Sequence, residues 1–118
     1  MSDAVIDPAA IENLRALNPD DGDDFLREIV AIFLEDTPHR LAELDQSLAA
    51  GDAAKFARAA HSIKGSSANL GAGILRAAAD RLEQHARTRG LDDTAPLLAA
   101  VKQEFTRAQH ALSDLIGQ

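Results

Sequence analysis

The sequence predicts an all-α protein, an antiparallel up-down four-helix bundle with a short additional helix at the N-terminus. Apolar residues recur at intervals of three and four along most of the chain, and no run alternates polar and apolar residues as a half-buried strand does. Alanine and leucine, both good helix formers, dominate the composition. A length of 118 residues suits one hydrophobic core, so we expect residues 1–118 to form a single domain.

The first expected helix is short. Asp7 is suited to cap its N-terminus, Pro8 fits its first position, and Asn18 followed by Pro19 ends it. Its apolar side carries Ile11, Leu14 and Leu17.

The second expected helix is long and runs from about Asp23 to Ala50. Acidic residues 20–24 suit a helix N-terminus, and apolar positions 25, 29 and 33 continue in phase through 41, 44 and 48. Pro38 lies inside this segment, and its ring removes a bond to the carbonyl of Leu34, so we expect a bend there. Two shorter helices are the alternative.

The third expected helix begins after Gly51, which suits a left-handed cap, and after Asp52, which suits an N-cap. It runs through His61 toward Gly71. Its apolar side carries Phe56, Ala59, Ile63 and Leu70.

The fourth expected helix spans about Ala72 to Arg89 and ends at Gly90, and the fifth restarts at residues 92–94. Their amphipathic patterns complete the set of four long helices that a bundle needs. The apolar positions are Ile74, Leu75, Ala78, Leu82 and Ala86 in the fourth, and Val101, Phe105, Leu112 and Leu115 in the fifth.

The composition excludes several classes of function. The absence of cysteine rules out disulfides and thiolate chemistry. A net charge of -7, with no Trp or Tyr, argues against a nucleic-acid partner. The chain has no run of 18 apolar residues, and its start lacks the basic then apolar order of a secretory signal, so we expect a cytoplasmic protein that does not enter a membrane.

His61 is the residue that most strongly suggests chemistry. At about 100° per residue it lies opposite the apolar side of its helix, and it shares its face with Lys64, Gly65 and Ala68, with Ala57 one turn before. A glycine inside an exposed helix costs about 1 kcal/mol relative to alanine and returns no packing. The small residues around His61 predict that another protein closely approaches an exposed imidazole. Lys64 could then offset the charge of a transferred phosphoryl group.

The bland alternative is an incidental surface histidine, but that interpretation leaves the cost of Gly65 unexplained. His39, His85 and His110 are expected on the surface, because they lack the helical spacing of metal sites. The glycines match neither common nucleotide-binding motif. We therefore expect no metal and no cofactor in this chain.

The segment from His61 to Gly71, HSIKGSSANLG, resembles the signature of histidine-containing phosphotransfer (HPt) domains. It has the family pattern of a histidine, a lysine three and a glycine four positions later, small residues, and a Leu-Gly end. The preceding FLEDTP of residues 33–38 is also similar, and the resemblance covers nearly the whole chain.

The resemblance implies that the Nε2 of His61 accepts a phosphoryl group, that Lys64 helps electrostatically and that Gly65 leaves room for the partner. Ala68 would belong to the small side chains around the site, and Gly71 would end the helix. Some family members have a glutamine twenty-two residues after the histidine that hydrogen-bonds the imidazole. Glu83 stands at that position here. As an acceptor it would favour a proton on Nδ1, and the alternative is that its side chain faces solvent.

The resemblance also implies partners. The phosphoryl group would pass between His61 and an aspartate of a response-regulator receiver domain, with Mg²⁺ held by the receiver and a sensor histidine kinase upstream. The chain would act as a phosphorelay intermediate with no kinase activity of its own, and a monomer suffices. We expect docking contacts from Ile11, Arg15 and Ala57. The alternative function is a passive helical interaction module without phosphotransfer.

Overall fold

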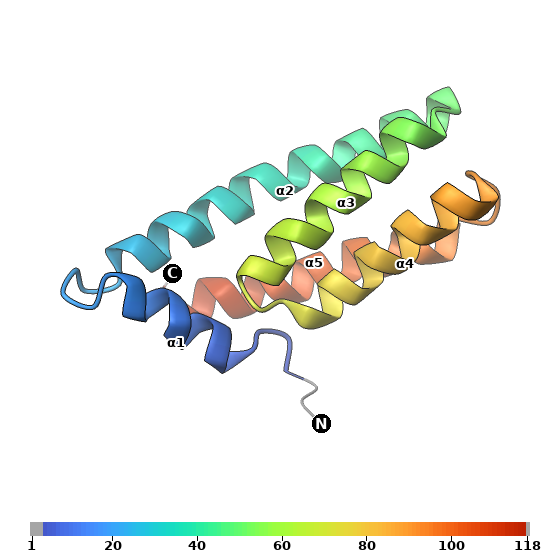
Figure 1. Ribbon diagram of the computed structural model, residues 1–118. Helices are drawn as coiled ribbons and strands as arrows, with labels where there is room; N and C mark the ends of the chain where they lie inside the picture. The colour runs from blue at the N-terminus through green and yellow to red at the C-terminus, as the bar shows by residue number, and fades with distance from the viewer. Residues whose placement is uncertain (1–3, 118) are drawn as a thin grey trace.

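The computed structural model describes residues 4–117, which form five α-helices and no strand. Four long helices run alternately up and down, and the short first helix lies at one end of them (Figure 1). This confirms the predicted all-α bundle with an additional N-terminal helix. The helices are α1 (Pro8–Leu17), α2 (Asp24–Ala50), α3 (Ala53–Asn69), α4 (Gly73–Arg89) and α5 (Ala95–Leu115).

Two helix starts follow the predicted capping. The Asp7 carboxylate accepts a hydrogen bond from the backbone N–H of Ala9 at 3.0 Å, with Pro8 in the first turn of α1. The Asp52 carboxylate accepts one from the N–H of Lys55 at 3.0 Å at the start of α3. Because these bonds satisfy backbone donors that have no partner inside the helix, they determine where α1 and α3 begin.

The second helix is continuous through Pro38, and Figure 1 shows it as one uninterrupted ribbon. The alternative of two shorter helices is therefore wrong. Proline removes a single backbone hydrogen bond, whereas α2 has buried residues on both sides of Pro38, from Leu26 to Ser47.

The buried face of α2 contains the predicted Phe33 and Leu44, but its other members lie beside the predicted positions. Thr37 and Ser47 lie on this face, and two polar residues there obscure the apolar stripe in the sequence. The Ser47 hydroxyl donates to the carbonyl of Glu43 at 2.6 Å, so it is satisfied within its own helix. The predicted positions 25, 29, 41 and 48 are only half-buried, and the fully buried ones are Leu26, Val30, Phe33, Thr37, Leu44 and Ser47.

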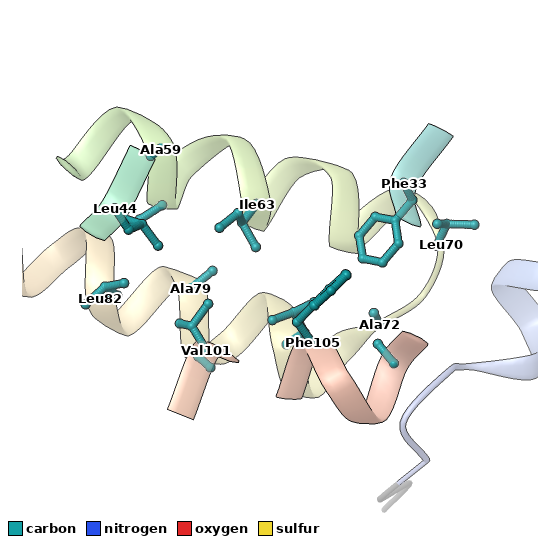
Figure 2. Close-up of a cluster of buried hydrophobic side chains, with 14 of the residues drawn as sticks. Phe33, Leu44, Ala59, Ile63, Leu70, Ala72, Ala79, Leu82, Val101 and Phe105 are labelled. Atoms are coloured by element: carbon teal, nitrogen blue, oxygen red, sulfur yellow. The ribbon is translucent and has the colours of Figure 1, made fainter. Parts of the chain in front are cut away.

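The core fills the space between the four long helices, as Figure 2 shows for a cluster of its side chains. The rings of Phe33 from α2 and Phe105 from α5 pack against each other, with their centroids 5.8 Å apart and their planes at 53°. On α3 the buried side is the predicted one, but on α4 and α5 Ile74 is half-buried and Leu115 is exposed. The predicted core residues confirmed here are Ile11, Phe33, Leu44, Phe56, Ala59, Ile63, Leu70, Leu75, Ala78, Leu82, Ala86, Val101, Phe105 and Leu112.

The first helix is anchored to the turn that follows α3. The backbone N–H of Asp7 donates to the carbonyl of Gly71 at 2.8 Å. Gly71 has φ +72°, and a Cβ added to it would lie 2.6 Å from the Cβ of Ala10. Gly71 therefore does more than end α3, because its bare backbone lets α1 come into contact with the bundle.

We expect Gly71→Ala to destabilise the protein more than Gly51→Ala. Both glycines have a left-handed φ, which costs an alanine about 1–2 kcal/mol, but a Cβ at Gly51 meets nothing within 4 Å. The contact with Ala10 should add about 1 kcal/mol or more at Gly71. Urea unfolding followed by circular dichroism measures both losses, and equal losses would contradict the close approach of α1.

Candidate functional site

His61 projects from the outer face of α3, and 62% of its side chain is exposed. The opposite side of the same helix carries Phe56 and Ile63, which are fully buried in the core. The expected exposure of the imidazole is therefore observed.

The surface of α3 beside the imidazole is free of large side chains. Gly65 and Ala68 are exposed on the same helix, and a Cβ added at Gly65 would meet nothing within 4 Å. No part of the described chain requires a glycine at this position for packing. The small size of residue 65 benefits only something that approaches from outside.

Glu83 reaches the imidazole from α4. Its two carboxylate oxygens lie 3.1 and 3.2 Å from Nδ1 of His61, and only 5% of its side chain is exposed. The alternative that Glu83 faces solvent is therefore wrong. A carboxylate can only accept here, so it favours a proton on Nδ1, and the neutral ring then has its lone pair on Nε2.

Two cationic side chains form ion pairs with the Glu83 carboxylate. Lys64 Nζ lies 2.8 Å from Oε1 of Glu83, and Arg87 Nε lies 2.9 Å from Oε2. Lys64 Nζ also lies 3.3 Å from Oδ1 of Asp80. We call His61, Lys64, Glu83 and Arg87 the Glu83 cluster, in which one buried carboxylate joins α3 to α4.

The Glu83 cluster keeps its carboxylate ionised. Burial by itself would raise the pKa of Glu83, but the hydrogen bonds from Lys64, Arg87 and His61 outweigh it and hold that pKa below its ordinary value. The bond to Glu83 in turn raises the pKa of Lys64. An ionised acceptor beside Nδ1 is thus present across the physiological pH range.

Lys64 does not point where the sequence suggested. Its side chain is 24% exposed, and its ammonium is occupied by Glu83 and Asp80 of α4 rather than standing free on the face of His61. The carboxylates on α4 attract it across the helix seam, and helical phase within α3 alone gives no sign of them.

Two members of the site were missed by sequence reasoning. Arg87 follows Glu83 by four residues, a spacing at which a carboxylate and a guanidinium pair on a helix, so its signal was present. Asp80 contacts Lys64 from the neighbouring helix. No pattern within either helix predicts that contact.

The expected docking residues are placed differently from the prediction. Ile11 and Ala57 are each only 2% exposed, so the expectation that they contact a partner is wrong. Ile11 is on the inner side of α1, and Ala57 is buried on α3. Arg15 is tied to Glu12 at 2.7 Å and Asp23 at 3.2 Å, and its proposed contact with a partner stays a prediction.

An apolar hollow opens near the end of α3, with a volume of ≈390 Å³. Leu17 and Ile32 at this hollow are 65% and 59% exposed, unusually open for large apolar side chains. The apolar hollow is lined by Leu14, Leu17, Phe25, Ile29, Ile32 and Asn69.

The other histidines take no part in the Glu83 cluster. His39 and His110 are exposed as expected, whereas His85 is half-buried with Nε2 2.6 Å from the carbonyl of Asp92. Between residues 4 and 117, no three acidic or histidine side chains are grouped so that they could hold a metal ion.

An exposed histidine whose Nδ1 contacts a buried carboxylate has Nε2 available to react with a group that another protein brings. The chain belongs to the Hpt domain family, whose model matches residues 28–111. Its relatives include a phosphorelay regulator and histidine-containing phosphotransfer proteins.

Three relatives illustrate this membership. Multistep phosphorelay regulator 1 of Schizosaccharomyces pombe is 31% identical over 88 residues, covering 75% of this chain but 30% of that protein, so the chain spans less than a third of this curated relative. The crystal structure of histidine-containing phosphotransfer protein B (HptB) from Pseudomonas aeruginosa PAO1 is similar at a TM-score of 0.84 and 31% identity, over 96% of this chain and 95% of that one. ZmHP2, a histidine-containing phosphotransfer protein from maize, has a TM-score of 0.84 and 26% identity, over 96% and 83%.

The lowered pKa of Glu83 predicts a pH-dependent stability. Ionised Glu83 stabilises the fold above its unfolded pKa, and this contribution is lost as the pH falls through the folded pKa. We therefore expect wild type to exceed Glu83→Gln in free energy of unfolding by about 1–3 kcal/mol at neutral pH. The difference should narrow at acid pH, below the ordinary pKa of a glutamate, because a protonated Glu83 resembles glutamine. Urea unfolding at both pH values measures the difference, and a gap independent of pH would contradict the cluster.

Proposed function

We propose that His61 is the phosphoacceptor and that the chain relays a phosphoryl group between His61 Nε2 and an aspartate of response-regulator receiver domains. The observation that carries this proposal is the exposed imidazole whose Nδ1 is held by the buried, ionised Glu83, beside an open Gly65. A passive interaction module would need neither the buried carboxylate nor the interior glycine.

The transfer is a direct displacement at phosphorus. The lone pair of Nε2 attacks the phosphorus of the receiver's aspartyl phosphate, the new N–P bond forms, and the bond from phosphorus to the aspartate oxygen breaks. The aspartate leaves as a free carboxylate. The proton stays on Nδ1, where the contact with Glu83 stabilises the positive charge that develops on the ring. Reversal of the same steps returns the phosphoryl group to an aspartate.

Lys64 supplies positive charge to the transferred group. Its ammonium rests on Glu83 and Asp80, only one turn of α3 beyond His61. A lysine side chain has enough rotatable bonds to exchange these carboxylates for phosphoryl oxygens as they arrive. Gly65 leaves the space in which the receiver's acidic pocket and its Mg²⁺ approach the ring, so this chain needs no metal or cofactor of its own.

The receiver docks over the apolar hollow as well as over His61. Asn69, which lines the hollow, follows His61 by two turns of α3, so one partner surface spans both. α1 then contributes through Leu14 and Leu17, and not through the buried Ile11. A standard interface of about 800 Å² per partner is large enough to cover the imidazole and the hollow together.

The cellular setting follows from this role. A sensor histidine kinase, separate or hybrid, supplies the phosphoryl group through its receiver, and this chain has no kinase activity of its own. A monomer in the cytoplasm, without nucleic acid, meets these requirements. No helix between residues 4 and 117 is long and apolar enough to cross a bilayer.

His61→Gln should abolish phosphorylation by a phosphorylated receiver domain. The expected product on the wild-type chain is acid-labile, base-stable phosphate, followed with a radiolabelled receiver. His110→Gln is the matched control, because His110 is an exposed helical histidine outside the Glu83 cluster, and it should transfer like wild type. Label on the His61→Gln chain, or none on wild type from several receivers, would overturn the proposal.

Gly65→Gln should separate stability from transfer. A helix former at an open position should leave stability unchanged or raise it by up to about 1 kcal/mol. Transfer should slow on the order of 10²-fold, because the longer side chain displaces the approaching receiver. Gly73→Gln, equally open at the start of α4, is the control and should transfer normally. Unchanged transfer in Gly65→Gln would refute the clearance argument.

A further inference from the structure

The Glu83 cluster poses an electrostatic problem for a histidine nucleophile. An unbalanced buried carboxylate beside Nδ1 stabilises the imidazolium ion, because an opposite charge in contact favours the charged form of a group. Imidazolium has a proton on both nitrogens, and therefore no lone pair on Nε2 with which to attack phosphorus. A neutral amide at position 83 would avoid this problem, but the chain has a glutamate there.

We propose that Arg87 is a positioning residue for phosphotransfer, which balances the charge of Glu83 so that the carboxylate accepts the Nδ1 proton without holding His61 as imidazolium. This inference deepens the proposed function and rests on it. Arg87 Nε contacts Oε2 of Glu83 at 2.9 Å, and the same oxygen lies 3.1 Å from His61 Nδ1. Arg87 thus fixes the oxygen that orients the ring.

Lys64 alone cannot balance the charge of Glu83. Its ammonium divides its charge between Glu83 and Asp80, and in the proposed transfer it leaves them for the phosphoryl group. Arg87 lies on the same helix as Glu83, one turn later, and its guanidinium stays charged at any physiological pH. When Lys64 moves, Arg87 is the cation that remains on the buried carboxylate.

The charged residues near the imidazole support these separate roles of Lys64 and Arg87. On α4 they are Asp80, Glu83 and Arg87, and on α3 they are Lys64 and Arg58. Arg58 is exposed one turn before His61 and forms no ion pair with another residue in 4–117. Lys64 and Arg87 balance Asp80 and Glu83, so loss of Arg87 leaves one negative charge unbalanced in the contacts of the ring.

Arg87→Met tests the proposal without a partner. Long-range ¹⁵N NMR of the imidazole rings follows the protonation of His61 as a function of pH. We expect the midpoint of the His61 titration in Arg87→Met to lie at higher pH than in wild type, because the carboxylate then stabilises the imidazolium. Transfer from a phosphorylated receiver should fall at pH values below the new midpoint and match wild type well above it.

Three further variants identify the cause. Arg87→Lys should restore most of the wild-type profile, because it returns the charge to the same position. Arg81→Met removes an exposed arginine of α4 that has no ion pair in the described chain, and its profile should match wild type. In a Glu83→Gln background, Arg87→Met should lose its effect on the His61 titration, since a neutral amide has no charge to balance.

A different result would reject this role for Arg87. An unchanged His61 titration in Arg87→Met would show that Arg87 does not balance the charge of Glu83. A loss of transfer that is equal at every pH and persists in Glu83→Gln would mean that Arg87 contacts the receiver directly. Failure of the proposed function is recognised separately, because wild type would then accept no phosphoryl group while the NMR titrations still report on Arg87.

Discussion

The carboxylate of Glu83 is the group on which this site depends. It is almost fully buried, and burial of a charge is costly unless hydrogen bonds and opposite charges offset it. His61 and Lys64 of α3 and Arg87 of α4 provide those contacts. The same contacts orient the imidazole, withdraw the lysine from solvent and keep the acceptor ionised. The contact between α3 and α4 therefore both stabilises the bundle and orients the imidazole of His61.

The two sides of α3 have opposite requirements. The inner side packs Phe56 and Ile63 into the core, which makes the helix rigid. The outer side keeps residues small around His61, at a cost in helix propensity at Gly65 that gives no packing in return. A rigid helix presents the imidazole in one position, and the surface beside it is open at Gly65. In the proposed function, the outer side of α3 serves binding and chemistry while its inner side serves stability.

Helical periodicity correctly predicted the features that depend on one helix alone, such as which face is exposed. It identified the exposed face of His61, the core side of α3 and the open position of Gly65. It was right that Ile11 is on the apolar side of α1 but wrong that Ala57 is exposed, because whether a small residue is exposed depends on which neighbour covers it. On α2 it agreed at Phe33 and Leu44 but missed part of the buried face, because polar Thr37 and Ser47 lie on that face and interrupt the apolar pattern. It left the direction of Glu83 open and gave no role to Arg87.

The sequence alone determined the helices, the N-caps of α1 and α3 and the exposed face of His61, since these follow from local hydrogen bonding and from a periodicity contained within each segment. Only the tertiary structure decided what surrounds the imidazole. Glu83 lies twenty-two residues from His61, and it reaches the ring because α3 and α4 pack antiparallel in one particular register. That register depends on the fit of many side chains in the core, and no single segment of the chain carries this information.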